Sequence, residues 1–148
     1  AQLAGVYSRR SNLFSSIIEA QSLEQLYAIF EGATSSFWNT HYTFEKSSKS
    51  SSKTLTKAFI NLLIINSIVP IKFAFHKFNR YSNPDNVLAI IRNIPMEHNS
   101  IVDKFHSLYA FGKTALDSQA LIQLKHMYCS KNKCLQCAIG SAILNRNS

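Results

Sequence analysis

The sequence lacks the motifs that carry most enzyme chemistry. It has no glycine-rich phosphate-binding loop, no nucleophile elbow and no HExxH metal motif. Its eight acidic residues are scattered singly, so no pair of carboxylates suited to acid–base catalysis is evident. It also has no Asn-Gly hairpin signal and no internal repeat. These absences argue against an assembled catalytic motif in this chain.

Cysteine is scarce as well, and its three residues lie within nine positions near the C-terminus. An odd, clustered set does not resemble the disulfide framework of a secreted domain. The N-terminal residues show no basic stretch followed by an apolar one, as a secretory signal would. We therefore expect a reducing, cytoplasmic location. Because the chain begins at Ala1 without methionine, we also expect it to be an excerpt of a longer protein.

Positive charge is in excess, with 16 basic residues against eight acidic ones and a net charge of +8. This excess favours anionic partners such as nucleic acid or phospholipid, although charge bears on association rather than on fold. Hydrophobic residues make up 46% of the 148 positions, which is ample material for a core. A chain of this size predicts one domain spanning residues 1–148.

The most apolar stretch runs from Lys57 to Phe78. A helix that is apolar on every side has to be surrounded, so we expect the other helices to pack around it. Pro70 removes an amide donor and clashes with the preceding turn, so we expect the helix to kink or break there, and two consecutive helices fit better than one span. The polar interruptions argue against a membrane span; they are Asn61, Asn66, Ser67, Pro70 and Lys72. Phe73 and Phe75 also alternate as a short strand would, but the flanking segments favour a helix.

Helical periodicity recurs along the rest of the chain. The expected helices are Ser11 to Ala20, Ser22 to Gly32 with a Ser22-x-x-Gln25 capping box, Asn83-Pro84 to Pro95, Ser100 to Gly112, Thr114 to Tyr128, and a last helix from about Cys134. Leu108 and Tyr109 are expected to face the core. The sequence therefore predicts an all-α fold, an irregular orthogonal bundle of about seven or eight short helices around a central buried helix pair.

Residues 35–45 are rich in aromatic side chains. Phe37, Trp38, Tyr42 and Phe44 surround His41 in sequence, and such rings can form a platform that stacks a nucleic-acid base. The alternative is that the rings pin this segment onto the core, because aromatic residues dominate core burial. The sequence favours the second interpretation without excluding the first.

Residues 46–57 form a serine-rich, lysine-rich segment that we expect to be a mobile surface loop. Its lysines can neutralise phosphates along a nucleic-acid backbone; they are Lys46, Lys49, Lys53 and Lys57, and Lys125, Lys131 and Lys133 near the C-terminus join the set. The alternative is a solvated linker, because no aromatic or arginine residue is interleaved with these lysines in the sequence.

The three cysteines are the candidate metal ligands. Cys129 closes one expected helix, and Cys134 and Cys137 are three positions apart at the start of the next, which would bring three sulfurs together. His126, one turn before Cys129, is the candidate fourth ligand for tetrahedral zinc or an iron–sulfur cluster. The alternative is that reduced cysteines fill a tight corner between helices, since free cysteine is often buried.

Asp117 offers one further catalytic interpretation, as a general base beside His106 or His126. Helix capping by Thr114 or Asp117 explains the same residues without a reaction and is the interpretation that we favour.

Four segments together resemble a known family. They are SSFWNTHYTF, KAFINLLIINSIVPIKFAF, ALDSQALIQLKHMYC and CLQCAIG, and they resemble the C-terminal part of the bacterial domain-of-unknown-function 2851 family. The resemblance implies longer relatives whose N-terminal portion is similar to restriction-endonuclease-like nucleases, but no Asp…Glu-x-Lys pattern occurs in these residues. The resemblance implies no activity. It extends to the positions of Cys129, Cys134 and Cys137, but it does not extend to His126.

We interpret the chain as a non-catalytic helical module of a larger bacterial protein that supports binding of an anionic partner such as nucleic acid. Its other partner would be the rest of the parent chain. The alternative is a structural domain that holds zinc or an iron–sulfur cluster through the cysteines.

Overall fold

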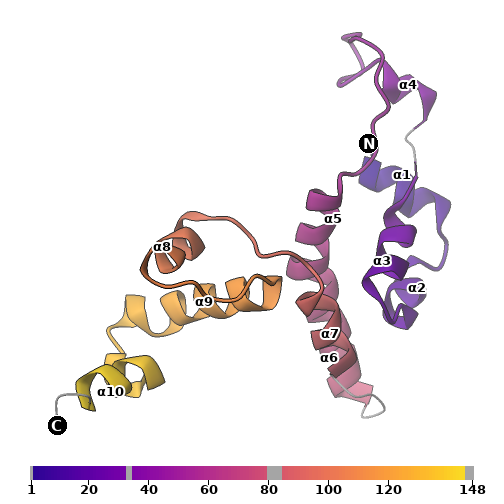
Figure 1. The fold of residues 1–148 in the computed structure, drawn as a ribbon. Coiled ribbons are helices and arrows are strands. Elements are labelled where there is room, and N and C mark those ends of the chain that lie inside the picture. Colours follow the sequence, from indigo (N-terminus) through magenta and orange to yellow (C-terminus); the bar gives the residue numbers. More distant parts are fainter. Residues whose placement is uncertain (1, 33–34, 80–84, 146–148) are drawn as a thin grey trace. The chain divides into compact units, whose positions relative to one another are not determined.

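The computed structural model describes residues 2–32, 35–79 and 85–145. These residues form helices joined by turns, and their only β-type pairing is two isolated bridges, His41 with Ser47 and Pro95 with Thr114 (Figure 1). The all-α prediction is confirmed. The chain divides into two compact units, residues 1–91 and 92–148.

The first unit contains most of the helices. They are α1 (Gln2–Arg9), α2 (Leu13–Glu19), α3 (Leu23–Phe30), α4 (Ser36–Asn39), α5 (Lys57–Leu63), a π-helical turn (Ile64–Ile68), α6 (Val69–Asn79) and α7 (Asp85–Arg92), which ends at the unit boundary. Helix α3 lies against α1, α2 and α5, and α2 also contacts α6. The predicted helix start at Asn83-Pro84 lies outside the described residues.

Lys57–Asn79 is one continuous helix, so the break expected at Pro70 is wrong. Figure 1 draws α5 and α6 in line. The turn Ile64–Ile68 just before the proline is π-helical, and the amide of Val69 bonds to the carbonyl of Ile64. A proline cannot donate the regular helical bond and crowds the carbonyl four residues earlier. The wider π turn accommodates that conflict without ending the helix.

One face of this helix is buried and the opposite face is not. Ile60, Ile64, Ile65 and Ile68 are buried, whereas six apolar residues are exposed: Phe59, Leu62, Ile71, Phe73, Phe75 and Phe78. The expectation of a fully surrounded helix pair is therefore wrong, because the neighbouring helices cover only one side. By length and composition this helix would suffice to cross a membrane, a test that core helices also pass.

Lys72 lies on the buried face of α6 and is 2% exposed. Its ammonium donates three hydrogen bonds, to the carbonyls of Ile17 at 2.9 Å, Ile18 at 2.7 Å and Ala20 at 2.8 Å. The last carbonyls of a helix have no partner within the helix, and these three end α2. Burial lowers the pKa of Lys72, while the three carbonyls favour its charged form. This lysine thus fastens α2 to α6.

Two of the other polar interruptions of the apolar run, Asn61 and Asn66, also make hydrogen bonds. The hydroxyl of Tyr27 on α3 donates to Asn61 Oδ1 at 2.6 Å, and Asn66 Nδ2 donates to the carbonyl of Leu62 at 3.0 Å. The predicted start of α3 is confirmed, since Ser22 Oγ accepts from the amide of Gln25 at 3.3 Å. The Gln25 side chain reaches back one residue further than expected and accepts from the amide of Gln21.

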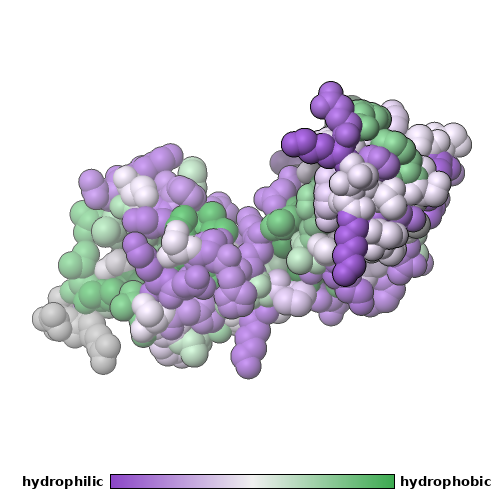
Figure 2. All heavy atoms as spheres, turned by 90° about the horizontal axis from the view of Figure 1, so that it is seen from above, coloured by the Kyte–Doolittle hydropathy of each residue, from purple (hydrophilic) through white to green (hydrophobic). Residues whose placement is uncertain are grey.

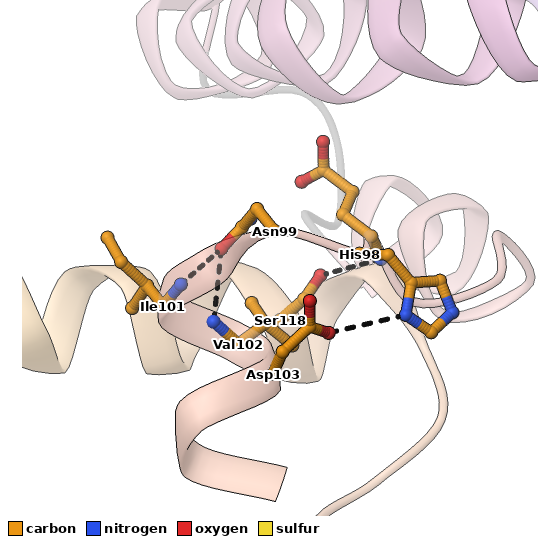
Figure 3. Close-up of polar contacts among 7 residues, drawn as sticks. His98, Asn99, Ile101, Val102, Asp103 and Ser118 are labelled. Atoms are coloured by element: carbon orange, nitrogen blue, oxygen red, sulfur yellow. Dashed lines mark hydrogen bonds and ion pairs between the residues drawn. The ribbon is translucent and has the colours of Figure 1, made fainter.

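The second unit holds α8 (Ser100–Leu108), α9 (Ala115–Met127), 3₁₀ turns at Cys129–Lys131 and Cys134–Gln136, and α10 (Ala138–Asn145). Helix α8 packs against α9. Its N-cap is Asn99 rather than Ser100: Asn99 Oδ1 accepts from the amides of Ile101 and Val102, both at 3.0 Å (Figure 3).

The C-terminal half of α8 departs from the prediction. The helix ends at Leu108, before Gly112, and Tyr109 is extended. Leu108 and Tyr109 are 82% and 69% exposed, so their expected inward orientation is wrong, whereas Val102 is fully buried as expected. Tyr109 has already left the helix, so it no longer follows the helical face that the periodicity assumed.

Candidate functional site

The aromatic residues of segment 35–45 gather into a surface cluster. The rings of Phe37 and His41 stack with centroids 4.1 Å apart and planes 7° apart. Trp38 contacts both Phe37 and Phe44 edge to face, each pair at 5.1 Å between centroids. Phe37 is 40% exposed, and Phe44 is 80% exposed. The interpretation that these rings pin the segment onto the core is therefore wrong for Phe37 and Phe44, which pack against other residues of the segment and keep exposed faces.

The lysine-rich segment that follows is partly fixed by backbone hydrogen bonds. The amide of Ser48 donates to the carbonyl of Thr40 at 2.6 Å, and the amide of Ser51 donates to the carbonyl of Asn39 at 2.9 Å. These bonds fold residues 47–51 back onto the end of α4. Residues 46–56 of the expected loop form no helix or strand, but they are anchored to the aromatic segment at this point, and Lys57 already belongs to α5.

Lys53 meets the aromatic residues directly. Its Nζ lies 3.5 Å from the centroid of the Tyr42 ring and donates to the carbonyl of His41 at 2.8 Å. Lys46 and Lys49 are exposed on the same segment. The fold thus supplies the interleaving of rings and lysines that the linear sequence lacks. We call Phe37, Trp38, Tyr42, Phe44, Lys46, Lys49 and Lys53 the aromatic–lysine surface.

The remaining candidate lysines lie elsewhere. Lys57 opens α5, with its Nζ 5.5 Å from the centroid of the Tyr27 ring. Lys125, Lys131 and Lys133 are exposed and belong to the second unit. The seven lysines that the sequence grouped by charge therefore fall into separate local sets.

The three cysteines line one cavity of about 200 Å³, together with apolar residues of α8, α9 and α10. All three are free thiols; Cys129 and Cys134 are exposed and Cys137 is buried. Their juxtaposition agrees with the sequence, but Cys134 and Cys137 do not share a helix face, because Cys134 lies in a 3₁₀ turn and Cys137 has extended backbone. The corner packs closely: Gly140 on α10 leaves no room for a Cβ beside the Cys134 carbonyl.

The arrangement does not fit a resident metal. Within residues 2–32, 35–79 and 85–145, no group of three or more His, Cys, Asp or Glu side chains is placed to hold a metal ion. His126 is exposed, and it is not among the residues that line the cysteine cavity. Tetrahedral zinc requires four converging ligands, which this corner does not present.

Asp117 caps a helix. Its Oδ2 accepts hydrogen bonds from Thr114 Oγ1 at 2.6 Å and from the Thr114 amide at 3.0 Å, and Thr114 Oγ1 accepts in turn from the Asp117 amide. The Thr114 side-chain and backbone bonds lower the pKa of the carboxyl. The capping interpretation is confirmed. The same end of α9 is tied to the loop between α7 and α8, where the amide of Glu97 donates to Ser118 Oγ at 3.3 Å (Figure 3).

Comparison with known proteins finds one match. The model of a family described as "Protein of unknown function (DUF2851)" matches residues 1–100. This range includes the aromatic–lysine surface and the Lys57–Asn79 helix, and it ends before the cysteines. No curated protein matches the chain, and no solved structure matches it.

Proposed function

We propose that this chain, which belongs to the DUF2851 family, is a non-catalytic helical module that binds single-stranded nucleic acid through its aromatic–lysine surface. The observation that carries the proposal is the contact between Lys53 and the Tyr42 ring within a cluster of exposed aromatic side chains. Proteins that bind single strands without sequence preference combine exposed rings, which stack bases, with cations that track phosphates.

The residues of the aromatic–lysine surface have different roles in the proposed binding. Phe44 and Tyr42 are 80% and 74% exposed and offer faces for stacking, which is worth roughly 1–3 kcal/mol per base. Lys46 and Lys49 supply phosphate contacts from the anchored segment. Lys53 already contacts a ring and a carbonyl, so its main role is to hold Tyr42 in place. The net charge of +8 adds a long-range attraction for any polyanion.

Fluorescence anisotropy with a labelled oligothymidine, repeated over a range of salt concentrations, tests the proposal. Lys46→Gln combined with Lys49→Gln should flatten the slope of log K against log salt by about 1.4, since each phosphate contact on a single strand contributes about 0.7. Phe44→Ala should weaken binding roughly 5- to 150-fold, the range that corresponds to one stacked base.

The matched control is the double substitution Lys131→Gln and Lys133→Gln, which removes the same charge from the second unit. It should flatten the slope of log K against log salt less than the Lys46→Gln and Lys49→Gln variant does. Equal slopes for the two double variants would show attraction to net charge alone and would overturn the assignment to this surface. An unmodified chain that shows no salt-dependent binding of single strands would end the proposal.

A further inference from the structure

Two adjoining cavities lie in the second unit. One is the cysteine cavity of about 200 Å³. The other, which we call the lysine cavity, has a volume of about 270 Å³ and is lined by residues of α8 and α9 that include Ile101, Lys104, Leu108 and Lys125. Phe105 and Cys129 line both cavities, so the two meet at these side chains. Together they reach the size of about 300–1,000 Å³ that is typical of small-molecule sites.

The two cavities differ in chemistry. Lys104 on α8 and Lys125 on α9 are two basic residues that line the lysine cavity, and no acidic side chain is among the residues that line either cavity. The cysteine cavity is walled by carbon and sulfur, from Leu124, Tyr128, Ile139 and Ile143 besides the cysteines. A ligand complementary to both would have an anionic end and an apolar end.

The surface next to the cysteine cavity is also apolar. Ile139 and Ile143 on α10 are 50% and 64% exposed. Figure 2 shows hydrophobic atoms at the surface in the part of the molecule where α10 lies. An alkyl chain that entered the cysteine cavity would cover these side chains and remove them from water, which is the usual driving force for binding such a chain.

We propose that the joined cavities bind one molecule of a single-chain fatty acid in its anionic form. The carboxylate lies near Lys104 and Lys125, and the alkyl chain runs along Phe105 into the cysteine cavity. The limited volume suits one chain rather than the two chains of a phospholipid. This site is separate from the aromatic–lysine surface, so either proposal can fail without the other.

Cys129 provides the first test, because it lines both cavities and is exposed. Iodoacetamide labelling of the full chain, followed by mass spectrometry of the peptides, gives the rate at Cys129. Decanoate below its micelle concentration should slow that rate at least tenfold at saturation. A control thiol in the first unit, Tyr7→Cys, is exposed and should react at an unchanged rate. Unchanged labelling of Cys129 at all decanoate concentrations would overturn the proposal.

Calorimetry provides the second test. Shortening decanoate to octanoate removes two methylenes and should weaken binding about 15-fold. The double substitution Lys104→Gln and Lys125→Gln should weaken the binding of decanoate at least tenfold. It should leave the binding of decanol unaffected, since decanol carries no charge. Lys131→Gln is the control. Both exchanged lysines are exposed, and circular dichroism checks that the variant keeps its helices. Equal affinity for octanoate and decanoate, or an unaltered affinity in the lysine variant, would overturn the proposal.

Vesicles of anionic phospholipid distinguish a free fatty acid from a membrane headgroup. They should leave Cys129 labelling unchanged. Protection by vesicles without protection by decanoate would assign the surface to a membrane and overturn the proposal.

Discussion

The Nζ of Lys72 lies 2.8 Å from the carbonyl oxygen of Ala20. The contact joins a lysine in the long apolar helix Lys57–Asn79 to the residue that caps the C-terminal end of α2, and two further carbonyls of that helix end share the same ammonium. A lysine ammonium has three donors, and all three are used here. The charge is also favourably placed, because the C-terminal end of a helix carries partial negative charge.

Lys72→Met should therefore destabilise the protein. Methionine keeps most of the apolar stem but leaves one buried and two half-buried carbonyls without their donor, so we expect a loss of roughly 2–4 kcal/mol in the free energy of unfolding. Urea unfolding followed by circular dichroism measures it. Lys77→Met, at an exposed position of the same helix, is the control and should change stability by less than about 0.5 kcal/mol. Equal effects of the two substitutions would contradict the assigned role of Lys72.

Replacing glycine by alanine should have opposite effects on stability at two positions, Gly5 and Gly140. Gly5 lies in α1 with nothing near the position of an added Cβ, so Gly5→Ala should stabilise the protein by about 0.5–1 kcal/mol through helix propensity. Gly140 lies in α10, where an added Cβ would overlap the Cys134 carbonyl. Gly140→Ala should destabilise by about 1–3 kcal/mol despite the same gain in propensity. Stabilisation by both changes, in urea unfolding, would show that the cysteine corner is not packed as described.

The Thr114–Asp117 capping box predicts a pH dependence. The pKa of Asp117 is lowered in the folded state, so its stabilising contribution is complete above the unfolded pKa of about 3.9 and is lost as pH falls through the folded value. Asp117→Asn should therefore lower stability at neutral pH, and the difference from the unsubstituted chain should shrink in acid. Thr114→Ala should cost about 1 kcal/mol. A difference that persisted unchanged at low pH would argue against the carboxylate as the cause.

Metal removal tests the cysteine corner. Because its ligands do not converge as a tetrahedral site requires, protein purified without oxygen should hold less than about a tenth of an equivalent of zinc or iron. A chelator should then leave the melting temperature unchanged, since no metal-binding energy contributes to folding. A stoichiometric metal and a chelator-sensitive melting temperature would instead restore Cys129, Cys134, Cys137 and His126 as ligand candidates.

Local patterns were enough to predict most of the helices and several caps, although α1 and α4 were not predicted. Ser22 and Thr114 begin their helices as expected, because a hydroxyl beside an apolar stripe satisfies an orphan amide through contacts only a few residues long. The aromatic–lysine surface could not be predicted in this way. Lys53 and Tyr42 are distant in the sequence, and their contact depends on the backbone folding back between Thr40 and Ser48.

The sequence by itself determined that this chain is helical and where its most apolar segment lies, because periodicity and capping act over a few residues. Only the tertiary structure decided that the helix continues through Pro70, that one of its faces stays exposed, and that Lys72 belongs inside. Those outcomes depend on which distant carbonyls and side chains meet each residue, and a linear pattern does not contain that information.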